Sequence, residues 1–399
     1  MYSTTELIQL RDQYRNDLLT NVLPFWLKHA PDWEEGGFVF NLAQDGAWMS
    51  TDKAIWIQGR FVWLLATMYH SVEARPEWLR AAKHGLEFLE RHGFAEDGKM
   101  LFLVDRAGKP LRKRRYIFSE TFLIVAYAAM AQATGEAHYG EKALALFEKT
   151  ITYLRTPGLL ESKVDPDTRP AKGLAIPMIL MVTAQEVRAA TQDPRCQQWI
   201  DEAISEIAQD FVKDEFQAVM EMVGPAGEFI DSFEGRMLNP GHAIEAAWFV
   251  LHEARLFPER TDLLALGKKI LDYSWSWGWD EIHGGIQYFR DVKHFPPTEY
   301  WHDMKFWWPQ NEAVIANLLA WSLTGEERYA RQHQQIHRYA HELFPDPEHG
   351  EWFGYFHRDG RLSTPLKGNY WKGPFHLPRM QWYCWQLLEE QLGHLGEKK

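Results

Sequence analysis

Apolar residues recur at intervals of three and four positions over long stretches of this chain. The pattern is clearest in the ranges 6–27, 56–69, 78–92, 118–133, 143–154 and 380–392. This spacing places the apolar side chains on one face of an α-helix and the polar side chains on the other. We therefore predict a chain built mainly from amphipathic helices.

Short aromatic stretches around turn residues lie between the predicted helices. Five such segments begin at Gly36 (GGFVFNLAQDGAW), Phe94 (FAEDGKMLFLVDRAG), Ala218 (AVMEMVGPAGEFID), Gly284 (GGIQYFRDVKHF) and Gly350 (GEWFGYFHRDGR). Alternating apolar residues beside a turn dipeptide are typical of small β-hairpins rather than of long strands. We expect hairpins at several of the helix connections.

The predicted helix pairs recur at intervals of about 60 residues, and no linker rich in Pro or Ser divides the chain. This favours one all-α domain over residues 1–399, an (α/α)6 barrel or toroid. Its inner helices would line a central funnel, with short β-hairpin loops at the mouth. A doubly wound α/β protein is rejected, because no Val/Ile-rich strands or Gly-rich phosphate loop alternate with the helices.

The overall charge argues against a nucleic-acid partner. The chain has 43 Lys and Arg against 55 Asp and Glu, a net charge of −12, whereas phosphate-backbone binding needs a concentrated positive surface. The one sharply basic run, Arg112 to Arg115 within GKPLRKRRYIFSE, is read as a solvated loop or a contact for a small anion. The balance of 46% hydrophobic and 25% charged residues is that of a globular protein with a large core.

Cysteine usage and the N-terminus indicate the compartment. Cys196 and Cys384 cannot form a disulfide framework and lack the clustered spacing of a structural zinc site. The first residues are polar and charged, and no run of 18 apolar residues follows. We expect a cytoplasmic protein with no membrane span.

The strongest candidate for chemistry lies in EGRMLNPGHAIEAAWFVLHEARLF, residues 234–257. Asn239 suits the N-cap of a helix and Pro240 its first position, which places His242 in the first turn and Glu245 one turn later. The helix dipole disfavours an imidazolium there, so the ring would stay neutral and available as a base. A histidine that merely satisfies loop carbonyls is the alternative.

A second cluster lies in LKGNYWKGPFHLPRM, residues 366–380. Glycine and proline punctuate a loop that would bring together an aromatic ring, two cations and a titratable base just before the last helix: Trp371, Lys372, Arg379 and His376. The segment predicts either a binding and catalytic site or a basic, aromatic loop that only seals the barrel.

A third candidate pairs a carboxylate with a distant cation. Glu312 follows Lys305, Trp307 and Trp308 at the start of a strongly apolar helix, where a buried carboxylate needs a partner. Arg60 is similarly set between aromatic residues. Facing one another across a ring of helices, the two would form a structural ion pair, or they would position a sugar oxygen and stabilise developing negative charge.

Taken together, these segments resemble the N-acylglucosamine 2-epimerase family, also called renin-binding proteins. The resemblance rests on WIQGRFVW, FSETF, FEGRMLNPGHAIEAAW, KFWWPQNEA, GEWFGYFHRDG and WKGPFHLPRM, in this order between residues 10 and 392. It implies an (α/α)6 barrel that interconverts N-acetylglucosamine and N-acetylmannosamine.

The resemblance also implies roles for individual residues. His242 and His376 correspond to the acid/base pair, and Arg60, Glu245 and Glu312 to the polar residues that support it. Trp371 corresponds to a stacking platform, and Arg236 to a further substrate contact. The clusters described above add Lys372 and Trp308 to the expected substrate-binding residues.

Other parts of the resemblance concern the substrate branch and the ligands. Epimerases and isomerases of cellobiose, mannose or sulfoquinovose carry an Asn-Met-His-like segment where this chain has GLAIPMILM from Gly173, which favours the N-acyl sugar branch. That branch implies activation by ATP without consumption, with SKVDPDTRPAKG supplying Lys163 and Arg169 as candidate phosphate contacts. A homodimer is implied, and no metal is expected.

The expected chemistry explains why two histidines are needed. Ring opening exposes the C1 aldehyde, which acidifies the C2 proton; one base removes it, and a conjugate acid on the opposite face returns a proton with inverted configuration. Histidine suits both roles near neutral pH, and Arg60 would stabilise the enolate oxygen.

Three other functions stay open. An aldose–ketose isomerase, or a 2-epimerase of an unmodified sugar such as mannose, glucose or cellobiose, would use the same barrel. A glycoside hydrolase would require two carboxylates around a glycosidic bond, which the His-centred clusters disfavour. A non-catalytic regulatory binding protein would need neither histidine for partner affinity.

Overall fold

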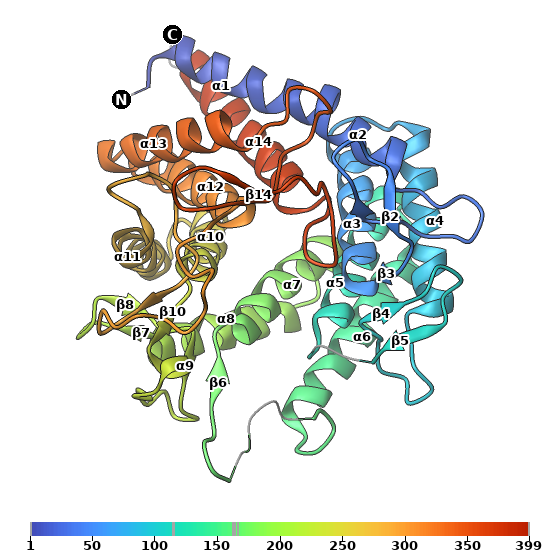
Figure 1. Ribbon diagram of the computed structural model, residues 1–399, viewed down its shortest axis with the longest axis horizontal. Coiled ribbons are helices and arrows are strands. Elements are labelled where there is room, and N and C mark those ends of the chain that lie inside the picture. The colour runs from blue at the N-terminus through green and yellow to red at the C-terminus, as the bar shows by residue number, and fades with distance from the viewer. Residues whose placement is uncertain (1, 114–115, 162–164, 166, 398–399) are drawn as a thin grey trace.

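The computed structural model describes residues 2–113, 116–161, 165 and 167–397. Figure 1 shows the helices arranged in a ring, with α1 (Thr4–Asp17) beside the last helix, α14 (His376–Glu397). The two ends of the chain therefore close the ring. The predicted (α/α)6 barrel is confirmed.

Six helices of the described chain form the inner wall, and each packs against an outer neighbour. The inner helices are α3 (Ile55–Ser71), α5 (Phe118–Thr134), α7 (Ala175–Thr191), α10 (Pro240–Leu256), α12 (Trp307–Thr324) and α14. Their outer partners, in the same order, are α4 (Pro76–His92), α6 (Ala137–Arg155), α8 (Arg195–Glu206), α11 (Thr261–Gly278), α13 (Glu327–Leu343) and α1.

The distribution of apolar residues decides which helices lie inside. Every residue of α12 from Trp307 to Ala320 is buried, as is every residue of α5 from Ser119 to Met130. In α13, by contrast, only one face is buried, consisting of Tyr329, Ala330, His333, Ile336 and Ala340. A helix that is apolar all round is stable only when neighbours cover it on every side, whereas an amphipathic helix can face water.

The predicted boundaries need two corrections. The helix predicted over residues 6–27 is interrupted: α1 passes through a π-helical turn, Leu18–Val22, into α2 (Leu23–His29). The residues His376 and Arg379, expected in a loop, lie in the first turn of α14. None of the helices in the described residues is both long enough and apolar enough to cross a membrane.

Short antiparallel strands connect the helices. Hairpins form at the segments predicted from Gly36, Phe94 and Gly350, as the pairs β1–β2 (Asn41–Leu42, Trp48–Ser50), β4–β5 (Leu103–Val104, Pro110–Arg112) and β13–β14 (Tyr355–Phe356, Leu362–Thr364). The prediction from Ala218 and Gly284 is wrong, because those strands pair with other segments. The pairs are β8 (Ala218–Val219) with β7 (Val212–Lys213), β9 (Met222–Val223) with β6 (Lys172–Gly173), and β11 (Arg290–Asp291) with β10 (Met237–Leu238).

Two further strands lie directly before inner helices and pair with strands of the hairpins described above. β3 (Lys53–Ala54) pairs with β4 and runs directly into α3, and β12 (Lys305–Phe306) pairs with β13 and runs directly into α12. The first turn of each of these inner helices is therefore fixed by a strand that immediately precedes it.

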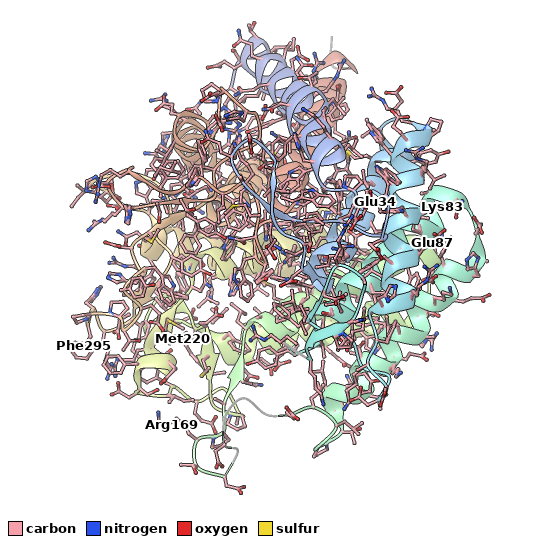
Figure 2. All side chains as sticks on the ribbon, turned by 45° about the vertical axis from the view of Figure 1, so that its right-hand side comes forward. Glu34, Lys83, Glu87, Arg169, Met220 and Phe295 are labelled. Atoms are coloured by element: carbon pink, nitrogen blue, oxygen red, sulfur yellow. The ribbon has the colours of Figure 1, made fainter. Side chains whose placement is uncertain are left out.

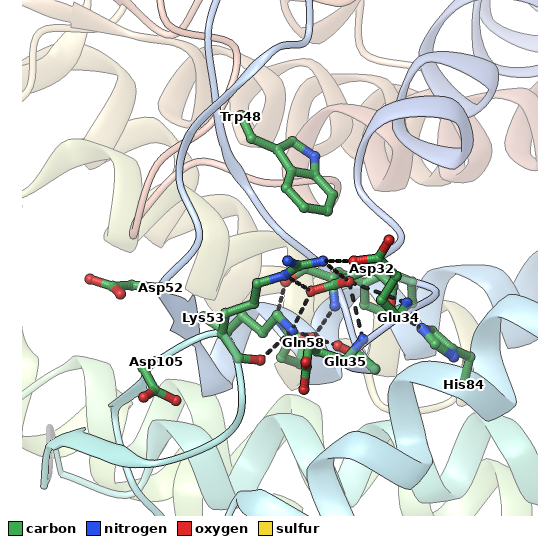
Figure 3. A network of polar contacts seen from close by, with 12 residues as sticks. Asp32, Glu34, Glu35, Trp48, Asp52, Lys53, Gln58, His84 and Asp105 are labelled. Atoms are coloured by element: carbon green, nitrogen blue, oxygen red, sulfur yellow. Dashed lines mark hydrogen bonds and ion pairs between the residues drawn. The ribbon is translucent and has the colours of Figure 1, made fainter.

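A buried ion pair repeats beside these strands. Lys53 Nζ lies 3.0 Å from Asp32 Oδ2, and Lys305 Nζ lies 3.0 Å from Asp280 Oδ2, with all four side chains at most 1% exposed. Arg106 and Arg358 each add a second cation, through Nε contacts of 2.8 and 2.7 Å. Figure 3 shows the first of these networks.

The aspartates also shape the turns that hold them. The Oδ1 atom of Asp280 accepts hydrogen bonds from the backbone N–H groups of Ile282 and His283, at 3.1 and 3.3 Å. Asp32 makes the same pair of contacts with Glu34 and Glu35. Burial favours the protonated acid, but hydrogen bonds from Arg358, Gln287 and Lys305 outweigh it and hold the pKa of Asp280 far below its usual range. The Asp280 carboxylate is thus charged, and both of its oxygens accept hydrogen bonds.

A third copy of this arrangement supports α14. Asp346 Oδ2 lies 2.8 Å from Lys367 Nζ, and Asp346 Oδ1 accepts hydrogen bonds from the backbone N–H groups of Glu348 and His349. Gln44 donates to this carboxylate, where the other two networks have an arginine. The same buried pair therefore recurs ahead of three inner helices.

Replacing Asp280 tests whether these pairs hold the barrel together. Asp280→Asn leaves the Lys305 ammonium buried without its counter-charge, which costs about 3 to 5 kcal/mol in comparable cases. We expect the free energy of unfolding in urea to fall by that amount. Asp359→Asn, which removes an exposed carboxylate paired only with Arg361, is the matched control and should change it by less than about 0.5 kcal/mol. If both variants lost the same free energy of unfolding, the buried pair would contribute no more to stability than the exposed one.

Three histidines on α13 form a row against α1, of which His333 is buried and His337 and His341 are half-buried. Tyr14 Oη contacts His333 Nε2 at 3.1 Å and His337 Nδ1 at 2.8 Å, and the ring centres of His337 and His341 lie 4.0 Å apart with the rings tilted. Burial lowers the pKa of all three imidazoles, to about 3 for His333 and about 4 for His341. The row is neutral in the folded protein at pH 7.

This row predicts a loss of stability in mild acid. Above the ordinary histidine pKa of about 6.5 both states hold neutral rings, so stability is complete; as pH falls toward 4 only the unfolded state takes up the protons. Three protons correspond to a slope of about 4 kcal/mol per pH unit.

Urea unfolding between pH 7 and 4.5 measures this slope. Carboxylates contribute to the same slope, so the difference between the native chain and His337→Asn is the informative quantity. In that variant, unfolding should take up about one proton fewer, so the slope of the free energy of unfolding against pH should be smaller by about 1.4 kcal/mol per pH unit. Identical slopes would contradict the assignment.

Candidate active site

A cavity of about 1990 Å³ occupies the centre of the ring and is lined by side chains from all six inner helices. Its volume exceeds the roughly 300 to 1,000 Å³ of ordinary small-molecule sites. The lining is rich in aromatic rings, including Trp56, Tyr288, Trp308, Tyr355 and Trp371. Rings of this kind offer flat apolar faces on which sugar C–H groups can stack.

His242 enters this cavity from the first turn of α10. The Asn239 side chain caps the helix by accepting a hydrogen bond from the His242 backbone N–H at 3.2 Å, as its sequence position predicted. The His242 Nδ1 atom lies 2.9 and 3.0 Å from the two carboxylate oxygens of Glu221. Because a carboxylate can only accept, this contact favours the tautomer with hydrogen on Nδ1, in which Nε2 is the basic nitrogen.

Glu221 is a site residue that the sequence reasoning missed. It lies between β8 and β9, and its backbone carbonyl accepts a hydrogen bond from Leu174 N at 3.0 Å, ahead of α7. The available signal was a lone carboxylate in the otherwise apolar stretch AVMEMV. Only the pairing of β9 with β6, which the sequence did not reveal, places it opposite His242.

His376 enters from the first turn of α14 and has its own carboxylate. Its Nδ1 atom lies 2.7 Å from Glu312 Oε1, and both side chains are buried. Burial lowers the pKa of His376 well below its ordinary value, because the charged imidazolium is excluded from water and faces Arg60 and Arg379. The ring is therefore a neutral base with Nδ1 occupied and Nε2 free to act.

Arg379 pairs with two carboxylates behind His376. Its Nη2 atom donates to Glu312 Oε1 at 2.7 Å and also to Glu245 Oε1. Trp248 Nε1 donates to the second oxygen of Glu312 at 2.7 Å. Glu312 was expected to need a partner. Arg379, Trp248 and His376 fill that role, so the suggested ion pair between Glu312 and Arg60 is not formed.

Glu245, Glu312 and His376 also bring three potential metal ligands to within 4.8 Å of one another. The Arg379 guanidinium donates to both carboxylates and so supplies a positive charge where a metal ion would otherwise do so. Glu245 and Glu312 share this one cation.

Arg60 lines the cavity within a cage of aromatic rings. Its guanidinium carbon lies 4.2 Å from the ring centres of Trp56 and Phe122 and 4.6 Å from that of Phe375. Burial lowers its pKa to about 9, so it is still cationic at pH 7. Its Nε atom has no hydrogen-bond partner, and among the described residues it forms no ion pair with a carboxylate. Such a cation is suited to receive negative charge from a bound ligand.

Trp308 lies between the two histidines. Its ring centre is 5.1 Å from that of His242 and 5.6 Å from that of His376, and all three side chains line the cavity. The structure thus gathers the expected residues His242, His376, Arg60, Glu245 and Trp308 around one space. Glu312 supports this group from behind, fully buried.

The remaining candidates have different positions. Trp371 lines the cavity at its edge and is 38% exposed. Lys372 does not line it, because its ammonium is buried in an ion pair with Glu351 at 2.8 Å. Arg236 is likewise engaged outside the cavity, with Asp231 and Asp291. Lys163 lies outside the described residues. Arg169 is exposed at the edge of the molecule near Glu234 (Figure 2).

Comparison with known proteins gives one consistent family. A family model described as N-acylglucosamine 2-epimerase matches residues 36–376. The chain is 36% identical to the N-acylglucosamine 2-epimerase of Bos taurus over 388 residues, covering 95% of this chain and 91% of that protein. It is 34% identical to the human protein of the same name, covering 99% and 93%. In fold, it is similar to the cellobiose 2-epimerase of Spirochaeta thermophila, with a TM-score of 0.84 at 21% identity, covering 97% and 98%.

Proposed function

The chain belongs to the N-acylglucosamine 2-epimerase family, and we propose that it interconverts N-acetyl-D-glucosamine and N-acetyl-D-mannosamine. The observation that carries the proposal is the pair of imidazoles in one cavity. Each has Nδ1 against a carboxylate, and both flank Trp308. Two imidazole bases lining one cavity are what proton transfer to and from opposite faces of one carbon requires.

The reaction begins with the open-chain sugar, because only the free C1 aldehyde acidifies the proton on C2. One imidazole Nε2 removes this proton, and the electron pair of the C2–H bond moves into the enolate, which places negative charge on the C1 oxygen. The second imidazole, protonated, then returns a proton to the other face of C2. Neither the carbon chain nor the N-acyl group changes.

Arg60 is the residue that we assign to the enolate oxygen. Its charge is already desolvated by Trp56, Phe122 and Phe375, so little reorganisation is needed when negative charge develops next to it. A low-dielectric aromatic surround strengthens this interaction relative to one in water. Glu245 and Glu312 act through Arg379 and His376, by holding those side chains in place.

The same residues would support an aldose–ketose isomerase, in which the proton returns to C1 rather than to C2, and a 2-epimerase of an unmodified sugar. The similarity to mammalian N-acylglucosamine 2-epimerases over nearly the whole chain favours the N-acyl substrate and retention of the aldehyde. A regulatory binding protein without turnover would not require two carboxylate-backed bases in one cavity.

The proposal extends to ATP, oligomeric state and location. We expect ATP to act as an activator that is not consumed, and we expect a homodimer in the cytoplasm. The burial of both free cysteines, Cys196 and Cys384, is compatible with a reducing compartment. Exposed aromatic side chains such as Phe233 and Phe295, each 52% exposed, offer apolar surface to a second copy.

Exchange at C2 in deuterated water tests the proposed reaction. Incubation with N-acetylmannosamine, with and without ATP, should place deuterium at C2 and form N-acetylglucosamine, which proton NMR follows directly. His242→Asn and His376→Asn should each lower the rate by at least about 100-fold, since general acid–base catalysis contributes that much or more. Both variants should keep the native helix content.

The product and the variants separate the alternatives. A ketose product would identify an isomerase, and exchange with mannose but not with N-acyl sugars would identify the other epimerase class. No exchange with any N-acyl hexosamine would exclude the proposed function. Unchanged rates in both histidine variants would exclude the mechanism.

The role of Arg60 is tested by Arg60→Lys. Lysine keeps the charge but loses the planar guanidinium that the aromatic rings hold, so we expect kcat to fall by about 100-fold, with a smaller change in KM. Arg80→Lys is the matched control, because Arg80 stacks on the exposed ring of Trp33 at 4.5 Å on the outer helix α4. A loss confined to KM would assign Arg60 to substrate binding alone.

A further inference from the structure

The two histidines of the cavity differ in the charge of the groups that support them. Glu312, behind His376, also accepts hydrogen bonds from Arg379 and Trp248. The hydrogen bonds that the Glu221 carboxylate makes within the described residues are those to His242. Within the described residues, Glu221 therefore has no arginine or lysine bonded to it, whereas the carboxylate behind His376 is bonded to the Arg379 guanidinium.

We propose that Glu221 is a positioning residue that holds His242 as the proton-carrying member of the pair, so that His376 is the neutral base of the resting site. The inference rests on the proposed function and adds to it the order in which the two histidines act. Glu221 acts through His242 and needs no contact with the sugar.

The contact geometry requires hydrogen on His242 Nδ1. Two carboxylate oxygens lie 2.9 and 3.0 Å from this atom, and two lone pairs facing each other at that distance would repel. The Asn239 side-chain nitrogen lies 3.1 Å from the same Nδ1 and is the weaker, neutral neighbour. With Nδ1–H directed to Glu221, the second proton of an imidazolium is on Nε2, the ring nitrogen that the Glu221 contact does not use.

Other charged groups of the described residues around the cavity are engaged elsewhere or lie against His376. On α10 itself, Glu245 is bonded to Arg379 of α14, and the helix N-terminus weakly opposes a cation at His242. Lys172 of β6 is held by Glu206 and Asp210. Burial lowers the pKa of His376, Glu245 opposes this shift, and Arg60 of α3 and Arg379 add to it. A carboxylate in direct contact outweighs the helix end, since it favours the charged imidazole by about 1 to 3 pH units.

The resulting order of proton transfers is balanced. Neutral His376 Nε2 takes the C2 proton while the C2–H electron pair enters the enolate, and the His242 imidazolium gives its Nε2 proton to the opposite face of C2. After one turnover His376 carries the proton and His242 is neutral. Exchange of protons with water restores the resting state. The reverse reaction starts from the state in which His376 carries the proton and His242 is neutral. The pair therefore holds one proton in both directions.

Titration of His242 by NMR tests the inference without relying on turnover. The full-length protein is labelled with ¹³C and ¹⁵N histidine, and the His242 signals are identified by their loss in His242→Asn. Glu221→Gln removes the charge but keeps the side-chain size, and we expect the titration midpoint of His242 to fall by at least about one pH unit. Glu228→Gln removes an exposed carboxylate from the same stretch of chain, at residue 228, and should leave the midpoint unchanged.

Kinetics supply the second readout. The upper pH limb of kcat/KM belongs to the singly protonated pair, so it should move to lower pH in Glu221→Gln by the same amount as the NMR midpoint. The rate at pH 8 should fall about tenfold, with recovery toward pH 6 and little change in KM. Both reaction directions must change alike, because the equilibrium constant is fixed. Glu221→Asp, which keeps a carboxylate, should retain most of the native profile.

The outcomes separate this inference from the proposed function. An unchanged His242 midpoint in Glu221→Gln would overturn the role of Glu221, whatever the activity. A loss of rate that is equal at every pH would also overturn it, because that result indicates a structural role. If the native protein gives no exchange with N-acyl hexosamines, the proposed function fails, and the NMR midpoint still decides the charge on His242.

Discussion

The buried aspartate–lysine pair is the interaction on which the barrel depends. Lys53, Lys305 and Lys367 each lie a few residues before an inner helix, and each is fixed by an aspartate from a distant turn. A lysine ammonium that is fully buried is stable only when its charge and its hydrogen bonds are satisfied. The pair therefore specifies one position for the start of each of these three inner helices, α3, α12 and α14, and those starts carry residues of the cavity.

The cavity uses charge differently from these supporting networks. The networks neutralise each carboxylate with one or two cations, as Asp280 shows with Lys305 and Arg358. In the cavity the cation Arg60 is surrounded by aromatic rings instead of carboxylates. A ring face attracts a cation but does not cancel its charge, so the guanidinium retains its capacity to stabilise an anion. This local imbalance is tolerated because the surrounding helix starts are held rigidly.

Much of the fold and part of the site could be predicted from the sequence. The helix periodicity gave the ring, and the Asn239–Pro240 signal gave the start of α10 and with it the position of His242. What failed depends on contacts between distant segments. Glu221 reaches His242 because β9 pairs with β6, about 50 residues earlier in the chain. Lys372 was grouped with His376 because they are four residues apart, but its ammonium is buried against Glu351. Local spacing cannot show on which side of a loop a long side chain is buried.

A sequence repeat that follows from the supporting networks explains how the site arose from a uniform scaffold. Lys53, Trp56 and Gln58 have the same spacing as Lys305, Trp308 and Gln310. Both glutamines make paired hydrogen bonds to the backbone of a residue six positions after the aspartate, Phe38 in one case and Ile286 in the other. In this register Arg60 and Glu312 occupy equivalent positions, seven residues after the lysine. One repeat thus places a cation in an aromatic cage, and the other places at the same position the carboxylate that supports His376. Because the backbone at these positions is already fixed, a change of side chain alone is enough to place a cation on one wall of the cavity and, behind the other, a carboxylate bonded to His376.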